Sequence, residues 1–143
     1  MASEEFETVY SISGRDFNNA GRVSTAIKNT LKSLGVSATV VRRVAIVTYE
    51  AEMNIVMYAT RGRMTLKVNP QTVTLDAEDE GPGIENVSLA MQEGYSTATA
   101  EMREMGFGAG MGLPNMVRNA DIFDITSEMG HGTRVHIQVN QAA

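Results

Sequence analysis

The spacing of apolar residues in the first sixty positions changes from near-alternation to a helical repeat. Residues 5–12 approach alternation, which predicts an opening strand. Over 16–34 the apolar positions recur every three or four residues, which predicts an amphipathic helix ended by Gly35. Ser37 is a residue type that caps helices, and the apolar stripe behind it predicts a second helix running to Ala59.

The next segments return to an alternating pattern and then lose any pattern. After an expected turn at 60–63, residues 64–69 and 71–79 alternate and predict a hairpin. Residues 81–112 then hold more than half of the thirteen glycines, with only a short helical pattern near 86–92. A loop of this length inside a compact domain is typical of a functional lid or of disorder.

The last thirty residues predict a helix and a closing hairpin. The helix covers 113–120, with Pro114 tolerated in its first turn, and the strands cover 121–128 and 133–140. Hairpins separated by helices favour an α+β fold, in which a mixed or antiparallel sheet is covered by helices on one face. The length of 143 residues predicts one domain over 1–143.

Composition narrows the functional classes. The chain has no cysteine, which excludes disulfides and thiolate metal sites, and its two histidines are too few for a His-based zinc site. The net charge of -5 without a basic cluster argues against nucleic acid as a partner. No apolar stretch is long enough to span a membrane, so we expect a soluble cytoplasmic protein.

Two residues of the predicted second helix could carry chemistry. Glu50 and Asn54 lie four positions apart, so their side chains project from one helix face. A carboxamide oxygen can ligate Mg²⁺, and a carboxylate can accept a proton. Taken alone, the pair is also typical of a solvated helix surface.

A second candidate site follows the predicted strand 71–79. A plain turn needs one glycine or proline, but "DEGPGI" places Gly81 and Gly83 around a proline, which indicates close approach to the backbone. The carboxylate of Asp79 could accept a hydrogen bond from the amino group of adenine. Thr133, in "GHGT", could place a hydroxyl or a bridging water against the same base. The alternatives are a solvated turn and an ordinary strand start.

The third candidate is the segment "GFGAGMGLPN". Alternating glycines before a helix free backbone N–H groups to form an anion-binding concavity, to which the helix N-terminus contributes. The segment lacks the Lys-Ser/Thr of a Walker loop and does not follow a strand as a Rossmann fingerprint does. A flexible linker is the alternative interpretation.

Together and in this order, these motifs resemble the nucleotide site of the GHKL superfamily, which has the Bergerat ATP-binding fold. Within it, "EAEMNIVMYA", "DEGPGI", "EGYSTA" and "GFGAGMGL" resemble the anti-sigma-factor serine/threonine protein kinases, and most closely the switch kinase of the stressosome. The resemblance implies a two-layer α/β sandwich. It also implies a kinase that uses ATP and Mg²⁺ to phosphorylate a STAS-domain antagonist or scaffold protein in a stress response. A sigma factor or a regulatory phosphatase is a further partner of such kinases.

The resemblance also assigns roles to residues. Those roles are general base for Glu50, Mg²⁺ ligand for Asn54, adenine recognition for Asp79 with Gly81 and Gly83 behind it, phosphate binding for Gly108, Gly110 and Gly112, and a second adenine-side contact for Thr133. The role of Arg103, the substrate protein, the controlling signal and dimerisation stay open.

Three other functions fit parts of the pattern. One is a nucleotide-dependent anti-sigma or phosphatase-activating binding module with little turnover. The presence of both Glu50 and Asn54 favours the kinase over this module. The others are the catalytic half of a histidine kinase and a gyrase-type ATPase clamp. The first would need a dimerisation helix upstream and the second a transducer domain, and the sequence indicates neither.

Overall fold

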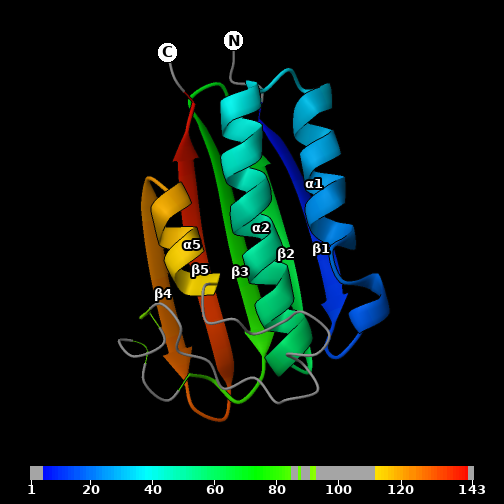
Figure 1. The fold of residues 1–143 in the computed structure, drawn as a ribbon, viewed down its shortest axis with the longest axis vertical. Helices are drawn as coiled ribbons and strands as arrows, with labels where there is room; N and C mark the ends of the chain where they lie inside the picture. The colour runs from blue at the N-terminus through cyan, green and yellow to red at the C-terminus, as the bar shows by residue number, and fades with distance from the viewer. Residues whose placement is uncertain (1–4, 85–86, 88–90, 93–111, 142–143) are drawn as a thin grey trace.

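The fold is a five-stranded antiparallel sheet with helices packed against one face (Figure 1). It is seen in a computed structural model that describes residues 5–84, 87, 91–92 and 112–141. The strand order is β1-β2-β3-β5-β4. The strands are β1 Phe6–Ser13, β2 Arg61–Val68, β3 Thr72–Glu80, β4 Ile122–Glu128 and β5 Gly132–Asn140. The helices are η1 Phe17–Asn19, α1 Arg22–Ser33, α2 Ala38–Tyr58 and α5 Gly112–Asn119.

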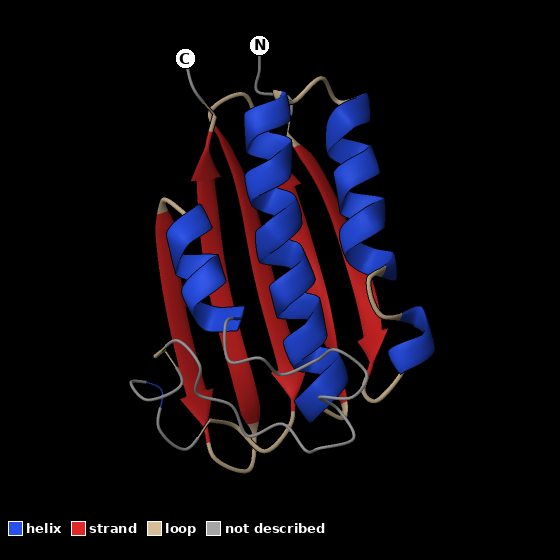
Figure 2. Ribbon diagram, in the orientation of Figure 1, coloured by secondary structure: helices blue, strands red, loops and turns tan. Residues whose placement is uncertain are grey.

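The helices form one layer and the strands the other, as Figure 2 shows. This confirms the α+β sandwich expected from the order of the elements, and every strand pair is antiparallel. The two hairpins meet where β3 pairs with β5, with Ala77 opposite Val135. This pairing brings the end of β3 next to the start of β5, although the two strands are far apart in the sequence.

Helix α2 is the centre of the helical layer and lies between α1 and α5 (Figure 1). Val44, Val47 and Ile55 are buried against the sheet, as the periodicity predicted. Its start is also confirmed, because the Ser37 hydroxyl accepts a hydrogen bond from the Val40 N–H at 3.4 Å.

The helix predicted over 16–34 is wrong at its start. The chain instead forms the short η1, turns at Gly21 with φ +97°, and begins α1 at Arg22. The reason is a tertiary contact: the buried carboxylate of Glu52 in α2 accepts hydrogen bonds from the backbone N–H groups of Gly21, Val23 and Ser24 at 2.9–3.1 Å. These N–H groups open the helix and have no partner within it.

The expected turn at 60–63 is also wrong, since β2 already begins at Arg61. Arg61 pairs with both Ser13 and Glu80, and Gly62 lies opposite Asp79. Residues 61–63 have a composition that favours a turn, but pairing with β1 on one side and β3 on the other makes them part of a strand.

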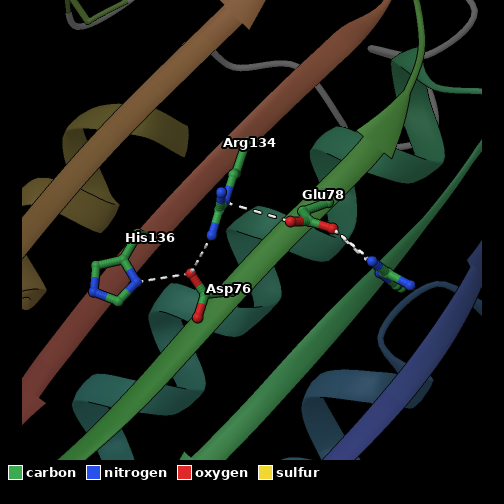
Figure 3. A network of polar contacts seen from close by, with 5 residues as sticks. Asp76, Glu78, Arg134 and His136 are labelled. Carbon is green, nitrogen blue, oxygen red and sulfur yellow. Dashed lines mark hydrogen bonds and ion pairs between the residues drawn. The ribbon is translucent and has the colours of Figure 1, made fainter.

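The opposite face of the sheet is polar. In Figure 3, Asp76 and Glu78 of β3 face Arg134 and His136 of β5. His136 Nδ1 lies 2.7 Å from Asp76 Oδ1, and Arg134 Nε lies 3.4 Å from Glu78 Oε2. These cross-strand pairs stabilise the sheet and fix its register on the side without helices.

Candidate nucleotide-binding site

One half of the candidate site lies where α2 faces the start of α5. Asn115 Nδ2 donates a hydrogen bond to Glu50 Oε2 at 3.0 Å. The side-chain oxygen Oδ1 of Asn115 accepts a 2.8 Å hydrogen bond from the Arg118 guanidinium. This contact orients the side-chain amide with its NH₂ group toward Glu50. Glu50 and Asn115 are both half-buried, so the carboxylate is held in place and still reaches the surface.

Gly112 completes this cluster by having no side chain. A Cβ at this position would lie 3.3 Å from Glu50 Oε1 and 3.7 Å from Asn54 Oδ1. The absence of a side chain at Gly112 therefore lets the start of α5 lie close to two side-chain oxygens. Carboxylate and carboxamide oxygens are suitable ligands for Mg²⁺, which binds through one or two protein groups together with phosphate oxygens and water. The residues present thus fit the metal that the sequence implies.

The other half of the candidate site is formed by the end of β3 and the start of β5. Thr133 donates its backbone N–H to Asp79 Oδ1 at 3.1 Å, and its hydroxyl lies 2.9 Å from the Ser127 hydroxyl. Ser127 Oγ also accepts a 2.7 Å hydrogen bond from the Ile84 N–H. The structure therefore brings Asp79 and Thr133 together, and their contact with a base stays a prediction.

The glycines of "DEGPGI" are explained in part by the protein itself. Gly81 donates its N–H to the His131 carbonyl at 3.2 Å. Gly83 has φ +80°, and a Cβ there would lie 2.6 Å from the Glu128 carbonyl oxygen. The close approach predicted at the second glycine is therefore made by the turn between β4 and β5, whether or not a base is bound.

Helix α2 connects the two halves of the site. Glu50 and Asn54 follow one another along it, Ala59 comes directly after its last residue, and a Cβ at Gly81 would lie 3.4 Å from Ala59 Cβ. Nine residues of helix span roughly 14 Å. The ends of α2 and β3 and the start of β5 lie at the same end of the molecule, and α5 begins about halfway along the sheet (Figure 1). Asn54 therefore belongs to the Glu50 cluster, one helical turn closer along α2 to the end that approaches β3.

Burial changes the acidity of Asp79. Removal from water disfavours the ionised form and raises the pKa of this carboxyl above its usual 3.8, and the Thr133 N–H opposes that effect in part. The folded protein thus retains a carboxylate that is poorly solvated. A hydrogen-bond donor arriving at Asp79 would replace some of the lost water contacts.

The remaining predicted residues are not covered by the structure. Gly108 and Gly110 of the phosphate loop, and Arg103, lie outside the described residues. Only Gly112 of that motif is described, as the first residue of α5. Their roles stay predictions.

Two contacting residues were missed from the sequence. The sequence pattern places Asn115 only within a predicted helix and Ser127 only within a predicted strand. Asn115 is polar and three positions beyond the last glycine of the motif, so a helical projection from Gly112 could have placed it on the same face. No sequence signal marks Ser127, because its partners come from two other segments.

Comparison with known proteins agrees with this geometry. Residues 39–143 match the family described as "Histidine kinase-, DNA gyrase B-, and HSP90-like ATPase", and the chain belongs to this family. The match covers α2, every strand except β1, and α5. Membership implies that the protein uses ATP.

Several relatives have more specific names. The chain is 30% identical over 112 residues to the serine/threonine-protein kinase RsbT of Bacillus subtilis, which covers 76% of this chain and 78% of that protein. It is 33% identical to the anti-sigma F factor of Clostridium beijerinckii over 53% of this chain and 50% of that protein. The anti-sigma F factor of Thermoanaerobacter sp. is 35% identical over 53% and 51% of the two chains. In the part of the chain that the structure describes, no helix has the length and apolar character needed to cross a bilayer.

Proposed function

We propose that the protein is a serine/threonine protein kinase that transfers the γ-phosphoryl group of ATP to a partner protein. The observation that carries the proposal is the cluster of Glu50, Asn54 and Gly112, in which Asn115 holds the carboxylate of Glu50. A family member that only bound nucleotide would have little need for an oriented carboxylate beside its metal ligand. The similarity to a serine/threonine kinase over most of the chain supports the same activity.

In this proposal each half of the site has one task. Asp79 accepts a hydrogen bond from the adenine amino group, and Thr133 supplies a hydroxyl at the same edge of the base. Asn54 provides a carboxamide oxygen to Mg²⁺, which when bound neutralises charge on the phosphates. The N-terminus of α5, together with Gly108, Gly110 and Gly112, directs N–H groups at the phosphate oxygens.

Glu50 acts on the incoming hydroxyl. The serine or threonine oxygen forms a bond to the γ-phosphorus, the bond from that phosphorus to the bridging oxygen breaks, and ADP leaves with the electron pair. The hydroxyl proton passes to the carboxylate of Glu50. General-base assistance of this kind typically contributes about 10²- to 10⁴-fold in rate.

For the protein substrate we propose a STAS-domain antagonist or scaffold in a partner-switching stress pathway, with a sigma factor or regulatory phosphatase as a further partner. The names of the relatives, one a kinase and two anti-sigma factors, support this assignment. The similarity to the anti-sigma factors also favours a second candidate function, nucleotide-dependent sequestration of a partner with little turnover. We place the protein in the cytoplasm, with homodimerisation open.

One experiment separates the two functions. The protein is incubated with γ-labelled ATP, Mg²⁺ and purified STAS-domain proteins from the same genome, and label on serine or threonine is measured. The kinase proposal expects stoichiometric label on one of them and a loss of label when Mg²⁺ is chelated. Nucleotide-dependent binding of a partner without any label would instead establish the sequestration function.

A further inference from the structure

An open groove of about 810 Å³ runs over the outer surface of α2 and ends at Glu50. Its walls come from α1 and α5, which lie on either side of α2 in Figure 1. The groove residues on α2 are spaced at three or four positions, so they form one face of that helix: Ala38, Val41, Arg42, Ala45, Ile46 and Tyr49. Eleven residues of helix correspond to roughly 17 Å, about three turns.

The floor of the groove is apolar and in part exposed. Tyr49 has 44% of its surface exposed, which is high for a large aromatic side chain beside a site. Ala45 and Ile46 are half-buried next to it. An aromatic side chain in a shallow apolar groove offers contact area to a partner at a small loss of conformational entropy.

The rim of the groove is basic. Lys28 and Lys32 of α1 and Arg42 of α2 form no ion pair with any residue that the structure describes. Arg43, one position further along α2, differs because its guanidinium Nη2 lies 3.3 Å from Asp121 Oδ1 in an ion pair. In a chain of net charge -5, three cations around one groove form a local positive surface.

We propose that this groove is the docking site for an acidic amphipathic helix of the protein substrate. Apolar side chains of that helix would pack on Ile46 and Tyr49, and its carboxylates would face Lys28, Lys32 and Arg42. Helix-in-groove binding of this kind is a common form of peptide recognition. Because the groove ends at Glu50, the docked helix brings the acceptor hydroxyl to the proposed base. The inference rests on the proposed kinase function.

Charge reversal with a matched control tests the proposal. Lys32→Glu and Arg42→Glu change the rim, whereas Lys67→Glu makes the same change on the sheet face without helices. The probe is a purified STAS-domain protein that the unaltered chain phosphorylates. We expect KM for that protein to rise about tenfold in each rim variant, with unchanged Kd for ATP and with Lys67→Glu like the unaltered chain. Equal effects of all three changes would overturn the docking site.

Photo-crosslinking gives a second measurement that does not need turnover. A photoreactive amino acid replaces Tyr49 in one chain and the exposed Val9 of β1 in another, and each is irradiated with the STAS-domain protein and an ATP analogue. The proposal expects a crosslink from position 49 and none from position 9. A crosslink from position 9 alone, or from neither, would overturn it. If no STAS-domain protein accepts phosphate, the kinase proposal fails. The crosslink then still shows whether a STAS-domain protein docks in the groove.

Discussion

Asn115 donates its side-chain amide to Glu50 across the junction of α2 and α5, at 3.0 Å. The contact joins residues that are 65 positions apart in the sequence. It is reinforced by the hydrogen bond from Arg118 to the side-chain oxygen Oδ1 of Asn115. A carboxylate held in this way keeps one oxygen bonded, and the other, Oε1, lies close to Gly112 at the start of α5. In the proposed kinase, that second oxygen accepts the proton.

Replacing Asn115 by alanine should therefore slow phosphoryl transfer without weakening ATP binding. A hydrogen bond to a charged group contributes about 1.5–3 kcal/mol, so its loss is expected to lower kcat by about tenfold to a hundredfold. Asn119→Ala is the control, because among the described residues the Asn119 side chain donates to the Asn115 backbone oxygen and not to Glu50. Steady-state kinetics on both variants checks this. An equal loss in kcat for the control would assign Asn115 a purely structural role.

Glu50→Gln should bind ATP and fail to transfer phosphate. The substitution preserves shape and removes the proton acceptor, so we expect kcat to fall by about 10²- to 10⁴-fold while Kd for ATP stays within about twofold. Single-turnover transfer and equilibrium nucleotide binding are the two measurements. Transfer at the normal rate would remove Glu50 from the role of base.

Asp79→Asn should weaken ATP binding and leave the fold equally or more stable at neutral pH. Loss of the carboxylate is expected to raise Kd for ATP by about tenfold to a hundredfold, because a hydrogen bond to a charged acceptor is lost. Titration with a fluorescent ATP analogue measures this. An unchanged Kd would count against adenine recognition by Asp79.

The effect of pH on stability follows from the raised pKa of Asp79. The folded chain binds this proton more tightly than the unfolded chain does. Protonation of Asp79 therefore adds to the free energy of unfolding, fully below the unfolded pKa, and this addition is lost as pH rises through the folded pKa. The stability gained by Asp79→Asn should therefore be largest at neutral pH and should shrink as the pH falls toward 4. Urea unfolding at several pH values tests this. A gain that grows toward acid pH would contradict the sign.

Gly132→Ala should destabilise the protein more than Gly130→Ala, although Gly130 lies in the turn between β4 and β5 and Gly132 follows it as the first residue of β5. A Cβ at Gly132 would overlap the backbone carbonyl of Asp79, whereas one at Gly130, where φ is +82°, would meet open space. We expect a loss of more than about 2 kcal/mol for Gly132→Ala and about 1 kcal/mol for Gly130→Ala. Thermal unfolding compares them. Similar losses would mean that the contact with Asp79 relaxes easily.

Glu52→Ala should destabilise the fold strongly, although Glu52 is not part of the proposed site. Its buried carboxylate accepts three backbone hydrogen bonds at the start of α1, and their loss leaves those N–H groups without partners. A loss of about 3 kcal/mol or more in the free energy of unfolding is expected. Glu52→Gln keeps part of the acceptor capacity and should lose less. Equal losses in the two variants would indicate that side-chain volume, and not hydrogen bonding, is what matters.

The sequence alone determined the elements whose signals are local. The stripe of α2, its Ser37 cap and the alternation of the strands depend on residues within one element, and each was correctly predicted. The order of the elements was enough to indicate a mixed or antiparallel sheet with helices on one face, and the strand pairing then showed that the sheet is antiparallel. The motifs around Glu50, Asp79 and Gly112 were also readable, because spacing along a helix or after a strand is a local property.

Tertiary structure decided what depends on contacts between distant segments. The start of α1 is set by Glu52 from another helix, and the start of β2 by strands on both sides, so local patterns misplaced both. Asn115 reaches Glu50, and Ser127 reaches Thr133, only because packing brings separate elements together. Side-chain hydrogen bonds across such distances leave no periodic trace in a sequence, and for this reason only the fold shows which polar residues meet.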